Sequence, residues 1–253
     1  MSSLNKIKIP QLALILLVTC SAWSACSEKQ EDPIVPTEPI DTEEPIDEPV
    51  DTMTTDTFTY LALGDSYTIG QSVEAELRWP VQLSNRLGEN GKFISELKII
   101  AQTGWTTGNL LNAIASQNPK NYDLVSLLIG VNNQYQGLSF SQFQTEFDSL
   151  LNISQALANG EDRFFVVSIP DYGVTPYGAG NSQQIGEELD MYNNYMSQKC
   201  YAQNIPFINI TDISRALGSS NGALAFDNLH PSGSQYGAWV NKILPVVIDL
   251  IGE

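Results

Sequence analysis

The chain has 253 residues, 42% of them hydrophobic, which is enough to bury a sizeable core in one large domain or two small ones. Its 29 acidic residues outnumber its 12 lysines and arginines, so the formal net charge is −17. An acidic chain without a cluster of basic residues has no electrostatic footprint for nucleic acid or for anionic lipid headgroups, and we exclude both as partners.

Residues 1–26 have the pattern of an export signal. Lys6 and Lys8 give a positive start, an apolar core follows at 12–18, and small residues come after it. The apolar core is too short to span a bilayer as a helix. We therefore expect export of the protein rather than a membrane-spanning segment.

The end of this signal offers a site for a lipid anchor. Cys26 follows small residues and resembles the lipidated cysteine of bacterial lipoproteins, which becomes the new N-terminus. Trp23 stands where such sites usually carry an aliphatic residue, and Cys20 is a competing but poorer match. We expect lipidation of Cys26 and anchoring in a bacterial cell envelope, facing the periplasm or the cell surface; ordinary secretion is the alternative.

Residues 27–57 have the composition of a disordered tether. They carry 11 acids against one lysine, include five prolines, and repeat an "EPID" theme. No hydrophobic period in this segment could bury a face. Most of the acidity of the chain therefore belongs to a solvated linker rather than to a site.

The remaining residues, 58–253, alternate apolar runs with helical periods and are expected to form the folded domain. The five apolar, β-rich runs are 59–64, 97–102, 122–130, 163–170 and 206–211. Continuous apolar strands separated by helices predict a parallel sheet that is covered on both faces. The fold class is therefore α/β, with one three-layer α/β/α domain around five strands.

Local signals place helices between these runs. Ser139 and Gln142 have the spacing of a capping box, for a helix that Gly160 ends. The last helix begins at about Ser232 and contains Pro245, which predicts a kink.

After processing at Cys26, one thiol remains in the folded part, so no internal disulfide can form there. That thiol belongs to a helical stripe of apolar residues: Ile185, Leu189, Tyr192, Met196 and Cys200. We interpret Cys200 as a core residue, the alternative being a reactive thiol.

The first apolar run breaks off at Gly64-Asp65-Ser66. In parallel sheets, ligands bind beyond the carboxyl ends of the strands, which is where this tripeptide stands. The same three residues would also suit a turn that only caps a helix. We interpret Asp65 as stabilising the turn and Ser66 as a candidate nucleophile, which needs a base because an unassisted hydroxyl hardly ionises at neutral pH.

The chain contains one histidine, His230, in the loop before the last helix. Histidine is well suited to take up and return a proton near neutral pH. Asp227 precedes it by three residues, a spacing at which a turn can bring the carboxylate to the imidazole and define its tautomer. The sequence thus supplies a serine, a base and an acid; a merely structural histidine is the alternative.

These motifs, in this order along nearly the whole domain, resemble those of the GDSL or SGNH hydrolase family. The resemblance implies that Ser66 is the nucleophile, that Asp227 and His230 complete the triad, and that the Ser66 backbone N–H contributes to an oxyanion hole. The glycine of the family's second motif corresponds to Gly104, whose N–H would be a second donor.

The family's third motif, Gly-x-Asn-Asp, is here Gly130-Val131-Asn132-Asn133. Asn132 matches the side-chain donor of the oxyanion hole, whereas Asn133 departs from the pattern, which predicts weaker hydrogen bonding behind the site. The resemblance also implies a flavodoxin-like strand order, 2-1-3-4-5. In that order Ser66, Gly104 and Asn132 lie at the ends of adjacent strands.

The expected activity is that of a serine esterase that transfers an acyl group to water through an acyl-enzyme. We expect no metal and no cofactor. One histidine and one remaining cysteine cannot form the usual transition-metal clusters, and the folded part has no calcium-loop spacing or glycine-rich nucleotide motif.

Substrate recognition is predicted from aromatic and polar residues in or beside the motif loops. The candidate substrate contacts near the motif loops are Tyr67, Trp105, Asn133, Tyr135 and Tyr172. The leading substrate class is a small-molecule or polysaccharide ester, such as an acetylated carbohydrate; a lysophospholipid or thioester is the alternative. A catalytically silent surface binding module is an alternative of another class. The oligomeric state is left open.

Overall fold

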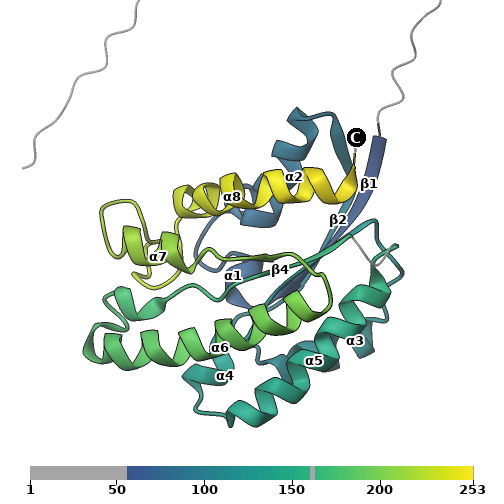
Figure 1. Cartoon of the computed structure of the whole chain (residues 1–253). Coiled ribbons are helices and arrows are strands. Elements are labelled where there is room, and N and C mark those ends of the chain that lie inside the picture. The colour runs from purple at the N-terminus through teal and green to yellow at the C-terminus, as the bar shows by residue number, and fades with distance from the viewer. Residues whose placement is uncertain (1–55, 160–162, 253) are drawn as a thin grey trace, which may run out of the picture. The chain divides into compact units, whose positions relative to one another are not determined.

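The structure is a computed structural model that describes residues 56–159 and 163–252 (Figure 1). The expected export signal, Cys26 and nearly all of the expected tether lie outside these residues. The first strand begins at Asp56, two residues before the expected start of the domain at 58. Gly160, the expected end of a helix, also lies outside the described residues, and that helix ends at Leu157.

Five parallel strands form one sheet in the order β2-β1-β3-β4-β5, which confirms the predicted flavodoxin-like order. The strands are β1 (Asp56–Gly64), β2 (Lys92–Ala101), β3 (Leu124–Leu128), β4 (Phe164–Val167) and β5 (Phe207–Ile208). Every residue of β3 and β4 is buried, as expected for central strands covered on both faces. The edge strand β2 is mostly half-buried.

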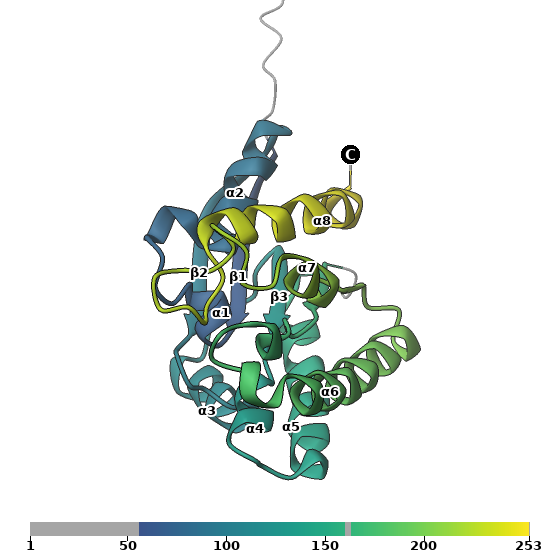
Figure 2. The same ribbon diagram turned by 90° about the vertical axis from the view of Figure 1, so that its left-hand side faces the viewer.

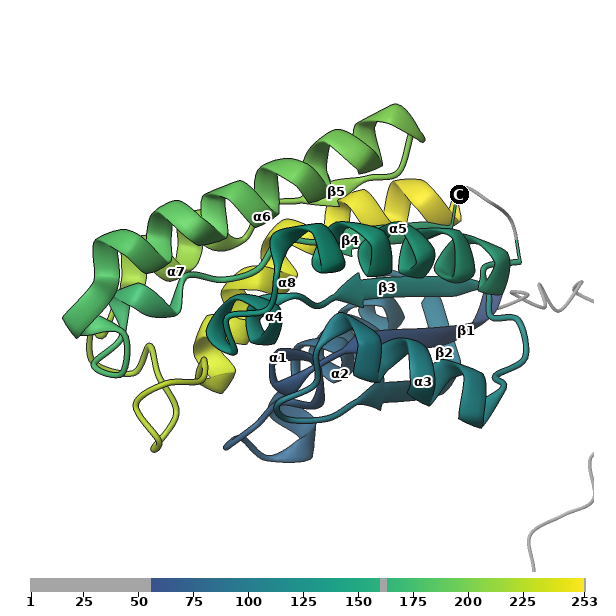
Figure 3. The same ribbon diagram turned by 90° about the horizontal axis from the view of Figure 1, so that it is seen from below.

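Helices cover both faces of this sheet, as Figures 1 and 2 show. One layer contains α2 (Trp79–Glu89) and α8 (Gly233–Ile251), which pack against each other. The other contains α3 (Thr107–Gln117), α5 (Phe140–Leu157) and α6 (Ser182–Ala202), seen side by side in Figure 3. The short helices are α1 (Ser66–Ile69), η1 (Ala75–Leu77), α4 (Val131–Tyr135), η2 (Tyr172–Val174), η3 (Ala179–Asn181) and α7 (Thr211–Leu217).

The local helix signals act largely as expected. The Ser139 side chain caps α5 by accepting a hydrogen bond from the Gln142 N–H at 3.2 Å. Ser232 caps α8, which continues as a helix through Pro245. None of the helices in the described ranges is long and apolar enough to cross a membrane.

The predicted stripe of α6 is buried along its whole length, including Cys200. Burial in apolar surroundings raises the pKa of the Cys200 thiol to about 12. The thiolate is therefore strongly disfavoured near neutral pH, which supports the interpretation of Cys200 as a core residue.

The carboxyl ends of the three strands nearest the predicted motifs lie in register. Gly64 at the end of β1 pairs with Ala101 of β2 on one side and with Leu128 of β3 on the other. The loops that follow these strands therefore start from the same edge of the sheet.

Candidate active site

A turn with little free space connects β1 to α1. A Cβ atom at Gly64 would lie 2.2 Å from the Thr68 hydroxyl and 2.5 Å from the backbone oxygen of Leu128, so only glycine fits there. Asp65 caps α1, because its Oδ1 accepts a hydrogen bond from the Tyr67 N–H at 3.0 Å. This bond confirms Asp65 as a turn-stabilising residue. Ser66 follows as the first residue of the helix.

The carboxylate of Asp65 is fully buried, and its second oxygen has no hydrogen-bond partner among the described residues. Burial raises the pKa of Asp65 to about 7, against a smaller opposing effect of the Tyr67 N–H bond. The capping bond therefore stabilises the turn without holding the carboxylate in its ionised form.

A second turn brings Asp227 to His230. Asp227 Oδ1 accepts hydrogen bonds from the backbone N–H of Leu229 at 3.0 Å and of His230 at 2.9 Å. Its Oδ2 lies 2.7 Å from His230 Nδ1. Asn228, between them, has a φ of +57°, a left-handed conformation that asparagine adopts more readily than most residues. The predicted contact across three residues is therefore present.

The Asp227 carboxylate has one further partner, the Ser72 hydroxyl, which donates to Oδ2 at 2.6 Å. Partial burial favours a raised pKa for Asp227, but the hydrogen bonds from Ser72, His230 and the backbone outweigh it and lower the pKa to about 2. Asp227 is thus a carboxylate acceptor at neutral pH.

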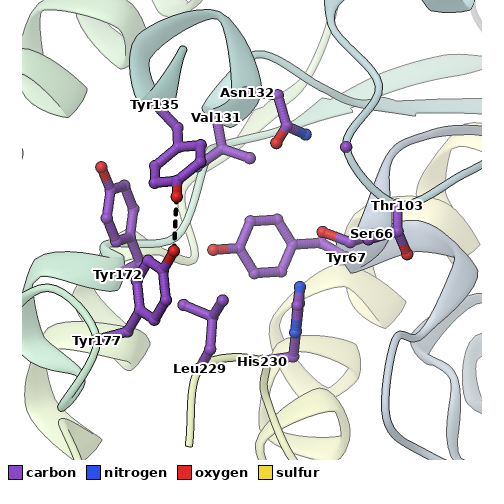
Figure 4. Close-up of a pocket in the computed structure, with 11 residues that line it drawn as sticks. Ser66, Tyr67, Thr103, Val131, Asn132, Tyr135, Tyr172, Tyr177, Leu229 and His230 are labelled. Carbon is purple, nitrogen blue, oxygen red and sulfur yellow. Dashed lines mark hydrogen bonds between the residues drawn. The ribbon is translucent and has the colours of Figure 1, made fainter. Parts of the chain in front are cut away.

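Ser66, Gly104, Asn132 and His230 line one pocket of about 210 Å³ (Figure 4). The ring of His230 points toward the Ser66 hydroxyl in this view. Gly104 has a φ of +84°, and a Cβ there would meet no atom within 4 Å, so the glycine leaves this side of the pocket open. The pocket therefore brings together residues that follow β1, β2 and β3 with the histidine before α8.

The Asn132 side chain reaches across to the loop that follows β2. Its Nδ2 donates a hydrogen bond to the backbone oxygen of Trp105 at 2.9 Å. This bond holds the amide beside Gly104, and a primary amide nitrogen carries a second hydrogen.

Asn133 does not line the pocket, which corrects its prediction as a substrate contact. It is fully buried, its Oδ1 accepts from the Thr107 N–H at 3.0 Å, and its Nδ2 donates to the Thr107 hydroxyl at 2.7 Å. The Thr107 hydroxyl in turn donates to the Glu146 carboxylate. Asn133 therefore connects α4 to the start of α3, and both of its side-chain polar atoms are hydrogen-bonded. The predicted weakening of the hydrogen bonds behind the site is not found at this residue.

Three of the four predicted aromatic contacts, Tyr67, Tyr135 and Tyr172, do line the pocket. Trp105 does not; it is half-buried and packs against the hydrophobic core, which corrects the prediction for this residue. The ring of Tyr67 makes an edge contact with His230 at a centroid distance of 5.8 Å. It therefore packs beside the histidine as part of the pocket lining.

Sequence reasoning missed Tyr177, which also lines the pocket and whose hydroxyl lies 2.6 Å from that of Tyr135. The sequence feature that could have predicted this residue is its position in a glycine-rich stretch after β4, near the carboxyl edge of the sheet. Thr103, Val131 and Leu229 complete the lining, and each is adjacent in sequence to a predicted motif residue.

A pocket at the carboxyl edge of a flavodoxin-like sheet, lined by a serine and a histidine that an aspartate holds, defines a hydrolase-type site. The chain belongs to the GDSL-like lipase/acylhydrolase family, whose model matches residues 62–238. It is therefore an ester hydrolase of the GDSL type. A search of curated proteins found no match.

Solved structures with the same fold include enzymes with different substrates. An acetyl xylan esterase from Geobacillus stearothermophilus is 18% identical, with a TM-score of 0.56, over 75% of this chain and 94% of that one. A phospholipase A1 from Streptomyces albidoflavus is 20% identical, with a TM-score of 0.55, over 75% and 98%. A lipase from a goat rumen metagenome is 20% identical, with a TM-score of 0.59, over 76% and 97%.

Proposed function

We propose that this protein is a serine esterase in which Ser66 attacks the ester carbonyl, His230 acts as general base and acid, and Asp227 orients His230. The observation that carries the proposal is the shared pocket of Ser66 and His230, with His230 Nδ1 held 2.7 Å from Asp227. A carboxylate acceptor at Nδ1 keeps the hydrogen on that atom, so the other ring nitrogen is free to accept the serine proton.

In the first half-reaction, Ser66 Oγ forms a bond to the carbonyl carbon while its proton passes to His230. The carbon–oxygen bond to the leaving alcohol then breaks, and the alcohol oxygen takes the proton from His230. In the second half-reaction a water molecule gives a proton to His230 while its oxygen attacks the acyl carbon. The bond between this carbon and Ser66 Oγ then breaks, which releases the carboxylic acid, and His230 returns the proton to Oγ.

Three donors would stabilise the negatively charged oxygen of the tetrahedral intermediate. The Ser66 N–H is at the first position of α1, where no preceding turn of helix can accept its hydrogen bond. The Gly104 N–H and the second amide hydrogen of Asn132 are the other two. The Asn132–Trp105 bond supports this assignment, because it fixes the amide beside Gly104.

For the substrate we propose a carbohydrate that carries a short acyl ester. Tyrosines present a ring face and a hydroxyl together, a combination suited to a sugar, and Tyr67, Tyr135, Tyr172 and Tyr177 line the pocket. The apolar contributions of Val131 and Leu229 favour the alternative, a lipid acyl chain. Dependence of the rate on acyl-chain length separates these two classes.

We also propose that the protein is exported and lipid-anchored through Cys26. The support for this comes from the sequence of residues 1–26 and from the acidic, proline-rich segment that separates them from β1. A tethered esterase of this kind would act on extracellular material.

The test is hydrolysis of 4-nitrophenyl acetate and octanoate by the purified protein, beside Ser66→Ala and His230→Ala. We expect both variants to lose activity while circular dichroism shows an unchanged fold. Diethyl 4-nitrophenyl phosphate should label Ser66 in the wild type, which peptide mass spectrometry would locate. Activity that persists in Ser66→Ala, or labelling at another residue, would overturn the proposed mechanism.

A further inference from the structure

Ser72 is the hydrogen-bond donor nearest to the Asp227 carboxylate. The Ser72 hydroxyl lies 2.6 Å from Oδ2, compared with 2.7 Å for His230 Nδ1 and 2.9 and 3.0 Å for the two backbone N–H groups on Oδ1. The two backbone bonds come from the same turn as Asp227 itself. Ser72 comes from the segment after α1, which contains the proposed nucleophile, and so connects the two halves of the proposed triad.

The backbone of Ser72 adopts a conformation that is unusual for this residue. Its φ is +66°, in the left-handed region that favours glycine. A glycine would adopt this φ without steric cost but could not donate to Asp227. The serine therefore combines a costly backbone conformation with a side chain that reaches the carboxylate.

Two neighbouring side chains extend the contact between Ser72 and Asp227 into a chain of hydrogen bonds. The Thr103 hydroxyl donates to Gln71 Oε1 at 2.5 Å, and Gln71 Nε2 donates to Ser72 Oγ at 3.4 Å. Ser72 Oγ thus accepts from Gln71, and it donates its own hydrogen to Asp227 Oδ2, because an ionised carboxylate oxygen can only accept. Thr103 lines the pocket beside Gly104, so a chain of hydrogen bonds runs from the proposed oxyanion loop to the proposed triad acid.

We propose that Ser72 is a positioning residue that fixes the Asp227 carboxylate, and through it His230, and that Gln71 and Thr103 orient the Ser72 hydroxyl. This inference rests on the proposed function of Asp227 and His230. Without the Ser72 bond, Oδ2 keeps only its contact with His230, and all the remaining donors to the carboxylate belong to the turn of Asp227 itself. The imidazole then spends less time aligned with Ser66.

Three substitutions separate the hydroxyl from the backbone conformation. Ser72→Gly removes the donor, and glycine adopts the φ of +66° easily. Ser72→Ala also removes the donor but keeps the unfavourable φ. Ser72→Thr keeps a hydroxyl, on a β-branched residue that tolerates this φ poorly. The control is Ser149→Ala, which removes a serine hydroxyl that donates to the backbone oxygen of Thr145 within α5.

We expect Ser72→Gly and Ser72→Ala to lower kcat for 4-nitrophenyl acetate about 10-fold, with little change in KM, as for the loss of one hydrogen bond to a charged group. Ser72→Thr should keep most of the rate although its unfolding temperature falls, whereas Ser72→Gly should be slow without a matching loss of stability.

Gln71→Leu provides a second, independent measurement. It should lower kcat by a smaller factor in the wild-type background and have no further effect in Ser72→Gly, because Gln71 acts through the Ser72 hydroxyl. If Gln71→Leu lowers kcat by the same factor in the wild type and in Ser72→Gly, Gln71 does not act through the Ser72 hydroxyl.

The rate of Ser66 labelling by diethyl 4-nitrophenyl phosphate gives a readout that does not depend on the choice of ester. If Ser72→Gly keeps the wild-type kcat and the wild-type rate of Ser66 labelling, the positioning role of Ser72 is overturned. It is also overturned if Ser72→Gly and Ser72→Thr lower kcat by the same factor. Both outcomes leave the esterase proposal intact. A wild-type protein that neither hydrolyses the esters nor becomes labelled at Ser66 would overturn both.

Discussion

Asp65, which caps α1 behind Ser66, and Asp227, which contacts His230, are two carboxylates whose surroundings change their pKa values in opposite directions. Asp227 accepts four hydrogen bonds, and its pKa is lowered to about 2. Asp65 accepts one from the backbone of Tyr67, its buried second oxygen has no partner within residues 56–159 and 163–252, and its pKa is raised to about 7. Full burial of Asp65 and hydrogen-bond donors to the ionised form of Asp227 thus decide that Asp227 is the carboxylate that can support a cationic histidine.

The raised pKa of Asp65 predicts how the stability of the protein depends on pH. In the unfolded chain an aspartate ionises at about pH 4, whereas the folded protein keeps Asp65 protonated up to about pH 7. Folding therefore binds a proton between these pH values. The contribution of Asp65 to stability is fully present below about pH 4 and is lost as the pH rises through about 7.

Asp65→Asn removes this ionisable group and keeps an oxygen that can accept from the Tyr67 N–H. We expect the unfolding temperature of the variant to fall less than that of the wild type between pH 4.5 and 7.5, as differential scanning calorimetry would measure. Asp249→Asn, at an exposed position on α8, should leave the wild-type dependence unchanged. A parallel pH dependence in Asp65→Asn and wild type would refute the raised pKa.

At the scale of elements, the pocket wall opposite Ser66 comes from α4 and from the segment between η2 and η3 (Figure 4). Tyr135 of α4 contacts Tyr177 of this segment through their hydroxyls, at 2.6 Å. The Tyr172 hydroxyl of η2 donates to Gln134 of α4 at 2.8 Å. The two elements thus form one wall held together by side-chain hydrogen bonds.

This wall predicts an effect on the preferred acyl-chain length. Tyr177→Ala removes a ring that is 57% exposed, so it should open the pocket with little loss of stability. We expect the ratio of kcat/KM for octanoate over acetate to rise about 10-fold, a size typical of small changes in an apolar pocket. Tyr177→Phe keeps the ring and should retain most of the wild-type ratio. An unchanged ratio in Tyr177→Ala would show that the wall does not limit chain length.

At the scale of the whole molecule, the proposed anchor can be tested apart from the activity. Cys26→Ala should abolish lipid attachment on expression in a bacterium, because the modified sulfur is removed, whereas Cys20→Ala should leave it unchanged. Metabolic labelling with an alkyne fatty acid, followed by mass spectrometry of the N-terminal peptide, measures this. Labelling that follows Cys20, or that is absent from the wild type, would favour the competing site or ordinary secretion.

Local sequence information located the five strands and the core stripe of α6, although β2 begins at Lys92, five residues before the expected run. The apolar runs, the Gly64-Asp65-Ser66 break and the Ser139 cap involve residues close together in the chain, so the backbone there responds to neighbours that the sequence displays directly. Asp227 and His230 were predictable for the same reason, because one turn joins them. The strand order followed from the resemblance of the motifs to the hydrolase family.

The contacts of Ser72, Tyr177, Trp105 and Asn133 depended on packing between distant segments. Ser72 and Asp227 are 155 residues apart, and a hydroxyl that follows a helix carries no local sign of the carboxylate it will reach. Asn133 and Asn132 are neighbours, yet one is sealed against α3 and the other faces the pocket, because successive residues of a helix project about 100° apart. The sequence alone determines which side chains are available for the site. The direction of each side chain is determined only by the tertiary structure, when the loops after β1, β2 and β3 pack together.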